Sequence, residues 1–505
     1  MSSLNRFLSA SAAAWVKILL TILTQVLLVP VFLAHWSVDE YGCWLIIQTI
    51  VGVSSMLSAS HHNFMGYEFL KVGDKHPEHL RRLFYSAVPF AVLIGIVELL
   101  GVSGLIYFGF IRTTLDPEGA LDAGLVHQAA WSLILYSISW LISSSVGGLA
   151  GRAVAPYGYF PRMTWWGTAL AIAQALVSGV AVALGADLFD TVLCIVIAGF
   201  VVNIPIHVDM WRMFRRHRLH PVTPEWTLGY ENIRRSLAIA LGAVLDISRQ
   251  QGVRIFLGAL IGVSQMTAFS TMRTMSNLSL QGIGTITNPI MPEIMRFLRE
   301  KDAERTKATV GFVWFLAVIL LSPVLIAFQW LMPLVFHAWT RGKIAFDPAL
   351  FGVFSITLLI FSIARPPMAV LQGNNLLRVQ LYMSIGVSAV AVGGIFLFTA
   401  RFGVAGAAAC LMAAELLGTV LTVWFAWKWL EKSAIAFPWR LFRIATASIV
   451  LAAVTIAAMS WLPRRSTLAI TLISEVLNGV LCIVFIRRLP PVALAKIRGL
   501  IKYRF

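Results

Sequence analysis

Apolar runs long enough to cross a membrane recur from one end of this chain to the other. A transmembrane helix needs about 20 apolar residues at 1.5 Å rise each. Backbone in hydrocarbon must satisfy its hydrogen bonds internally, so these runs predict helices. We expect an all-α polytopic membrane protein of about 14 transmembrane helices, with spans near 11–36, 41–69, 81–111, 124–150, 158–184, 189–213, 233–260, 264–295, 306–335, 347–372, 376–400, 404–428, 439–461 and 466–486.

Composition excludes a soluble domain of any size. Only 12% of the 505 residues are charged, against about 25% in soluble proteins. The net charge of +17 is not carried by a basic, aromatic-rich soluble module, so we expect no nucleic-acid partner. The four cysteines each stand alone in an apolar run, which argues against a metal site. Small residues at 9–14 precede the first apolar run, so we expect a retained span and not a cleaved signal.

Loop charges predict the orientation and the division of the chain. With a cytoplasmic N-terminus, the inside segments hold 29 Lys and Arg and the outside segments hold 6. This asymmetry follows the positive-inside rule and predicts an inner-membrane protein with both termini in the cytoplasm. The expected divisions are an N-terminal lobe (1–214, spans 1–6), a cytoplasmic inter-lobe loop (215–232), a C-terminal lobe (233–430, spans 7–12), and two extra spans with a basic cytoplasmic tail (431–505). Tight turns at 37–42 and 262–265 indicate a weak internal repeat, as in many transporters.

Five basic residues remain inside predicted spans: Lys17, Arg249, Arg254, Arg273 and Arg365. An ionisable side chain at mid-bilayer costs about 2.5–3.5 kcal/mol on insertion scales, so it normally faces a partner or a water-filled cavity. Asp246 lies three residues before Arg249 on one helix face and could neutralise it, but one carboxylate does not neutralise Arg254 as well. Lys17 is close enough to the inner interface to snorkel. Arg365 precedes two prolines that kink its helix.

Amide and histidine side chains are further candidates for a polar lining inside the predicted spans. Asn277 and Gln281 follow Arg273 at steps of four, and Gln25 lies eight residues after Lys17, so each set shares a helix face. Interhelical hydrogen bonds explain such amides about as well as a substrate path. His61 and His62 point about 100° apart on a helix, which favours a polar lining over a metal site. No spacing singles out any of the scattered carboxylates, which are Glu68, Glu98, Asp209, Glu415 and Glu475.

Enzyme signatures are absent from the sequence. There is no Walker loop, GxSxG or HExxH motif, and the outside loops are short. Membrane polymerases and ligases of glycans usually need a sizeable catalytic outside loop. We therefore expect no catalytic residues, no cofactor and no metal.

Several short motifs carry a resemblance to a known family. They are VPVFL at 29–33, EYGCW at 40–44, NPIMPE at 288–293 and FGVAGAA at 402–408. With the span pattern, they make the chain resemble the polysaccharide transporter (O-antigen and exopolysaccharide flippase) family of the multidrug/oligosaccharidyl-lipid/polysaccharide exporter superfamily. The resemblance implies two six-helix lobes around a central cavity with two C-terminal helices behind.

The resemblance also implies a function. Such proteins move undecaprenyl-pyrophosphate-linked oligosaccharides between leaflets by alternating access, coupled to a proton or sodium gradient. Arginine suits phosphate because its rigid fork has five donors. The five basic residues would then hold the anionic head group, and Asp246 would tune Arg249 or bind the coupling cation. The expected partners are membrane lipids and the polymerase and chain-length machinery of surface glycans such as lipopolysaccharide.

Three other readings stay open. A cation-coupled drug or metabolite antiporter of the same fold would need carboxylates facing its cavity. A glycan polymerase or ligase, and a non-transporting scaffold in a glycan assembly complex, are the remaining two.

Overall fold

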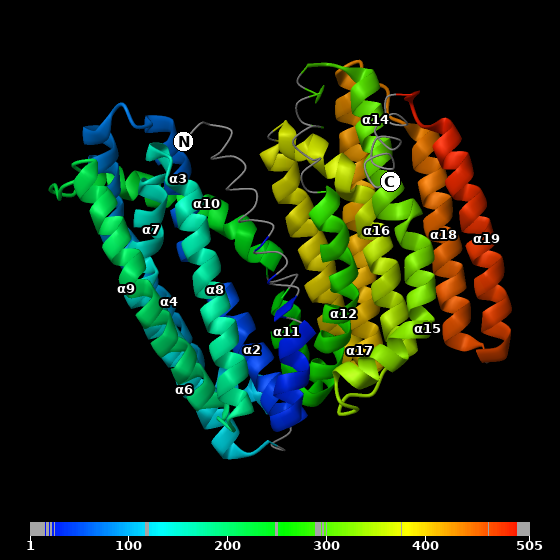
Figure 1. Ribbon diagram of the computed structural model, residues 1–505, viewed down its shortest axis with the longest axis horizontal. Coiled ribbons are helices and arrows are strands. Elements are labelled where there is room, and N and C mark those ends of the chain that lie inside the picture. The colour runs from blue at the N-terminus through cyan, green and yellow to red at the C-terminus, as the bar shows by residue number, and fades with distance from the viewer. Residues whose placement is uncertain are drawn as a thin grey trace, which may run out of the picture. The chain divides into compact units, whose positions relative to one another are not determined.

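The computed structural model describes residues 26–116, 121–247, 251–287, 300–374, 376–462 and 464–491, with isolated positions at 16, 20, 23, 24, 294, 297 and 298. Within these residues every regular element is a helix (Figure 1). The predicted all-α membrane fold is therefore confirmed. Contacts group the chain into two compact units, Met1–Thr267 (unit 1) and Ala268–Phe505 (unit 2). The predicted division into lobes at 214, 232 and 430 was based on the order of the spans, and it stays a prediction.

The first continuously described helix of unit 1 is the short apolar helix Val26–His35. Figure 1 shows α4, α6, α8 and α9 of this unit running side by side, and neighbouring pairs among them are in contact. The helices of unit 1 are α2 (Val38–Ser54), α3 (Met56–Val72), α4 (Pro77–Tyr107), α5 (Phe110–Leu115), α6 (Ala123–Ser143), α7 (Ser145–Ala153), η1 (Ala155–Tyr157), α8 (Phe160–Ala183), α9 (Leu188–Arg216), α10 (Trp226–Ile247), α11 (Val253–Ile261) and the start of α12 (Val263–Thr287).

Unit 2 is built around one heavily buried span. The helices α14 (Ala303–Trp314) and α15 (Leu321–Trp339) continue each other through a π-helical turn, η4 (Phe315–Ile319), and 72% of the most apolar window of this span is buried. Trp314 is fully buried and its indole N–H donates to the Ile363 carbonyl at 2.9 Å. The other helices of unit 2 are α16 (Pro348–Gly373), α17 (Leu377–Lys432), α18 (Trp439–Trp461) and α19 (Arg464–Arg488).

The span count agrees with hydropathy where the structure allows a comparison. Among the described residues nine helices are long and apolar enough to cross a membrane, or ten if α2 and α3 form one span. α17 merges two predicted spans across a kink at Gly403, whose φ of 58° ends the first of them. The predicted spans 11–36, 233–260 and 264–295 run partly through residues outside the described ranges.

The second predicted span, 41–69, is not a single straight helix. It is broken at Ser55 into α2 and α3, which bend by 40°. The Ser54 and Ser55 hydroxyls each donate to a carbonyl one turn back, of Val51 and Gly52, both at 3.2 Å. Such hydrogen bonds compete with the helix backbone and often accompany bends.

The two predicted tight turns, 37–42 and 262–265, are shorter than predicted, because 38–42 lies in α2 and 263–265 lies in α12. Ser37 caps α2, with Glu40 completing a capping box. Gly262 ends α11 at a φ of 79°, a conformation that favours glycine. A Cβ added to Gly42 would meet the Val263 and Thr267 side chains, so the start of α2 packs closely on the start of α12.

The contact between α4 and α10 depends on one glycine. A Cβ on buried Gly229 would overlap the Ser86 carbonyl oxygen and the Phe90 ring. We therefore expect Gly229→Ala to lower the free energy of unfolding by about 1–3 kcal/mol, the usual cost of overpacking. Gly101→Ala, on a face of α4 with nothing within 4 Å, should be neutral or slightly stabilising, because alanine is the better helix former. Unfolding of the purified variants in detergent measures this, and equal stability of Gly229→Ala and wild type would contradict it.

Candidate functional site

A partly open cavity of about 360 Å³ lies among the helices of unit 1. Its walls come from the helix Val26–His35 and from α2, α6, α8 and α9. No Lys, Arg, His, Asp or Glu is among the described residues that line it. Its principal polar and aromatic lining residues are Trp44, Gln48, Tyr136, Trp140, Gln174 and Asn203, together with serines at 139, 143, 144 and 178.

Hydrogen bonds hold the cavity side chains in place. The Gln48 amide of α2 donates to the Tyr136 hydroxyl of α6 at 3.1 Å. The Asn203 amide donates to the Gly199 carbonyl of its own helix at 2.8 Å. The cavity therefore presents amides, hydroxyls and indoles without formal charge. This chemistry suits an uncharged, hydroxyl-rich ligand, since such pockets use a few placed polar groups among apolar and aromatic walls.

The buried carboxylate of Glu98 is connected to the cavity through two hydrogen bonds. The indole N–H of Trp140, a lining residue, donates to the Ser58 hydroxyl at 3.3 Å. That hydroxyl donates to Glu98 Oε2 at 2.5 Å, and the Ser58 backbone N–H donates to Glu98 Oε1 at 2.9 Å. Glu98 is only 7% exposed.

A second buried carboxylate, Asp209 of α9, has a cationic partner. It accepts from Arg162 Nη2 at 2.6 Å and from the Trp166 indole N–H at 2.9 Å. The ion pair neutralises the carboxylate and ties α8 to α9. Asp209 therefore has a structural explanation that Glu98 lacks.

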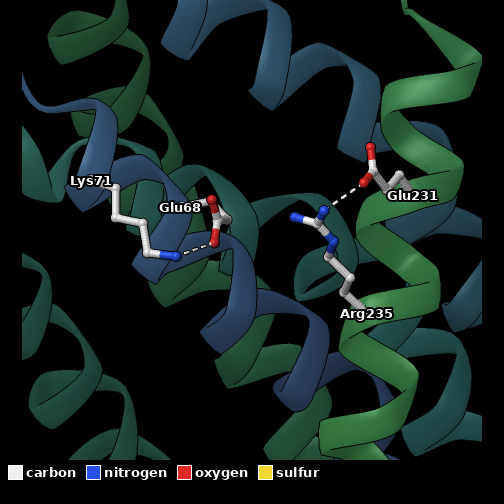
Figure 2. Close-up of polar contacts among 4 residues, drawn as sticks. All are labelled: Glu68, Lys71, Glu231 and Arg235. Atoms are coloured by element: carbon white, nitrogen blue, oxygen red, sulfur yellow. Dashed lines mark hydrogen bonds and ion pairs between the residues drawn. The ribbon is translucent and has the colours of Figure 1, made fainter.

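Arg82 of α4 pairs with Glu225 at 3.5 Å, and two other ion pairs of unit 1 lie within single helices. Figure 2 shows Glu68 with Lys71 on α3, and Glu231 with Arg235 on α10. Each pair joins residues three or four apart on one helix, and such pairs contribute about 0.2–0.5 kcal/mol. They are not part of the cavity.

The predicted cationic residues are only partly described. Arg254 is half-buried on α11 of unit 1, with Tyr41 of α2 as its electrostatic neighbour. Within the described part of the chain no carboxylate lies within 4.0 Å of its guanidinium. Lys17, Arg249 and Gln25 lie outside the described residues, as does the side chain of Asp246.

Unit 2 contains the remaining predicted basic residues. Arg365 is half-buried on α16, with its guanidinium 5.6 Å from the centre of the Phe361 ring. Arg273, Asn277 and Gln281 are half-buried on α12, which is continuous through them, so they share one helix face as predicted. Their role in holding substrate stays a prediction.

The two predicted lining histidines are buried between helices of unit 1. His61 Nδ1 lies 3.0 Å from the Ser236 hydroxyl of α10, and His62 Nε2 lies 2.9 Å from the Ser145 carbonyl of α7. Neither is among the residues around the cavity. A polar lining role for them stays a prediction.

Similarity in three dimensions extends over nearly the whole chain. It aligns with lipid II flippase MurJ in its inward closed conformation at a TM-score of 0.62, with 10% identity, covering 94% of this chain and 97% of that one. The chain has the fold of MurJ. An inward-facing multidrug resistance MATE family transporter of the MOP superfamily aligns at 0.57, with 14% identity and coverage of 86% and 96%. An outward-facing multidrug resistance MATE family transporter of the MOP superfamily aligns at 0.55, with 12% identity and coverage of 85% and 96%.

Sequence comparison adds nothing to this. No family model and no curated protein matches the chain. At these identities the structural likeness establishes the fold, which is the fold that the short motifs predicted. The polysaccharide branch stays a prediction.

Sequence reasoning missed the cavity and the Glu98 network. Gln48, Gln174 and Asn203 were visible as amides within predicted spans, and the Ser54–Ser55 pair was a signal for the helix break. Ser58 and Glu98 lie 40 residues apart on different helices. No spacing within one helix could have paired them.

Proposed function

We propose that this protein is a flippase for undecaprenyl-pyrophosphate-linked oligosaccharide repeat units. It moves them from the inner to the outer leaflet of a bacterial inner membrane, for O-antigen or exopolysaccharide synthesis. It works by alternating access with both termini in the cytoplasm, and it hands its product to the polymerase and chain-length machinery.

The uncharged polar cavity of unit 1 is the observation that carries this proposal. Amides and hydroxyls match the hydroxyl groups of a sugar, and the indoles of Trp44 and Trp140 offer apolar faces to a sugar ring. The cavity volume of about 360 Å³ lies within the range of about 300–1,000 Å³ found for ligand pockets. MurJ, which shares the fold, is a flippase.

The pyrophosphate needs a different environment from the sugar. Arg254, half-buried and without a carboxylate partner among the described residues, is suited to a bidentate contact with phosphate. We assign the same task to the other predicted basic residues, which are Lys17, Arg249, Arg273 and Arg365. Sugar and phosphate would then be held by different parts of the protein.

A cation-coupled drug or metabolite antiporter is the main alternative. A cationic drug would be favoured by a carboxylate in the cavity wall, and the described lining contains none. The MATE likeness keeps the alternative worth testing.

Surface glycan analysis of a deletion strain tests the proposal against its rivals. Loss of a flippase leaves no surface glycan, whereas loss of a polymerase leaves single repeat units. Drug susceptibility should be unchanged relative to the parent strain, and a plasmid copy of the gene should restore the glycan. Intact glycan with raised drug susceptibility would instead indicate the antiporter.

A further inference from the structure

Glu98 lies deep in the membrane-spanning part of α4. It stands 21 residues after the helix begins and nine before it ends. Its neighbours Val97 and Leu100 are 50% and 64% exposed, as expected of side chains that face lipid. Glu98 itself points inward, toward α3 and α6.

The groups that contact Glu98 are electrically neutral. They are the Ser58 N–H and hydroxyl, with Trp140 behind the hydroxyl. Among the described residues, no Lys, Arg or His lies within ion-pair distance of this carboxylate. An ionised carboxylate in the bilayer without a counter-charge is costly, and a bound proton or cation removes that cost.

Among the described side chains, no titratable group on the helices packed against α4 forms an ion pair with Glu98. His61 and His62 of α3 follow Ser58 by about one turn and contact α10 and α7. The others on these helices are Tyr67, Glu68 and Lys71 of α3, Arg112 of α5, His127 and Tyr136 of α6, Arg152 of α7, and Tyr230, Glu231, Arg234, Arg235 and Asp246 of α10, the last with its side chain outside the described residues. Arg152 donates to Asn63, Tyr136 accepts from Gln48, Lys71 pairs with Glu68, and Arg235 pairs with Glu231.

The carboxylate also caps a broken helix. Ser58 is the third residue of α3, so its N–H is one of the four at a helix start without an intrahelical acceptor. Ser55, at the N-cap position, makes no side-chain cap. Glu98 supplies the missing acceptor from α4, at the point where α2 and α3 bend by 40°. The ionised carboxylate therefore stabilises the bend.

Protonation would reverse one bond of this network. A neutral carboxyl group would donate its O–H to the Ser58 hydroxyl, which now donates to it. The Ser58 oxygen has two lone pairs and would then accept from both Glu98 and Trp140. The cap on α3 would weaken, because hydrogen bonds to a charged acceptor are about twice as strong as neutral ones.

We propose that Glu98 is the proton-binding site of this protein and links proton uptake to the bend between α2 and α3 beside the cavity. One of its two contacts is a backbone N–H, which suits a carboxylate but repels a metal cation, so a proton fits the site better than sodium. Its role in driving substrate movement rests on the proposed flippase function. The proton site itself does not.

Labelling with dicyclohexylcarbodiimide tests the site without any substrate. This apolar reagent adds to protonated carboxyl groups in membranes, and mass spectrometry quantifies the adduct on the Glu98 peptide of the full-length protein in proteoliposomes. We expect labelling at low pH that falls about tenfold per pH unit once the site has titrated. Sodium at constant ionic strength should not protect it. Glu68 in the same sample should stay unlabelled, because its carboxylate pairs with Lys71.

Two variants sharpen the test. Glu98→Gln should lose the label. Ser58→Ala removes a donor to the ionised form, so labelling should persist to higher pH than in the wild type, a shift that a purely structural role would not produce. Absence of label at every pH, or protection by sodium, would overturn the proposal. Failure of the flippase function would show instead as normal glycan in the deletion strain, with labelling unaffected.

Discussion

Filling the cavity of unit 1 will block transport. Gly199 is a buried residue of α9 in the cavity wall, and a Cβ there would lie 3.7 Å from Gln174 Nε2. A phenylalanine at this position would extend past Cβ into the space assigned to the sugar. We expect Gly199→Phe to reduce surface glycan at least tenfold, which corresponds to about 1.4 kcal/mol of lost binding.

An exposed glycine of α8 supplies the matched control. Gly167 has nothing within 4 Å of an added Cβ, so Gly167→Phe should complement the deletion strain as well as wild type. Glycan yield is compared at equal membrane abundance of the two variants. Wild-type yield from Gly199→Phe would show that substrate does not use this cavity.

Removing the charge of Arg254 is expected to have an effect of similar size. If its guanidinium binds the pyrophosphate, Arg254→Gln loses a charge-assisted hydrogen bond of about 1.5–3 kcal/mol, which is roughly a 10- to 100-fold loss of transport. Arg254→Lys keeps the charge but not the planar fork, so its activity should lie in between.

The control for Arg254 is Arg235, an exposed arginine paired with Glu231 on α10 (Figure 2). Arg235→Gln should leave transport unchanged, because Arg235 is exposed and pairs with Glu231, one turn away on the same helix. Export of labelled glycan precursor in membrane vesicles measures all three variants. Equal rates for Arg254→Gln and Arg235→Gln would remove Arg254 from the substrate site.

Hydropathy and loop length predicted the architecture well because both are local properties. The turn before α2 and the end of α11 fall where Ser37 and Gly262 stand, since a capping box and a positive-φ glycine act on neighbouring residues. The kink in α17 at Gly403 separates two spans that apolar runs had already separated. Helix termini of this kind are determined by a few neighbouring residues, so they can be predicted from the sequence.

The site was harder to predict because it depends on contacts between helices. Glu98 and Asp209 look alike in sequence, each a single carboxylate in an apolar run. The structure separates them, since Arg162 neutralises Asp209 whereas neutral donors hold Glu98. The substrate role of the buried arginines was predicted from their charge alone, and charge gives no information about which helices face each other.

The most direct test of the flippase proposal is the fate of its substrate in cells that lack the protein. Undecaprenyl-linked oligosaccharide is quantified by mass spectrometry, and its leaflet is assigned by accessibility to a membrane-impermeant reagent. The proposal predicts that the intermediate accumulates in the inner leaflet and that its mass identifies the glycan. Normal turnover of the intermediate, with intact surface glycan, would contradict the proposal.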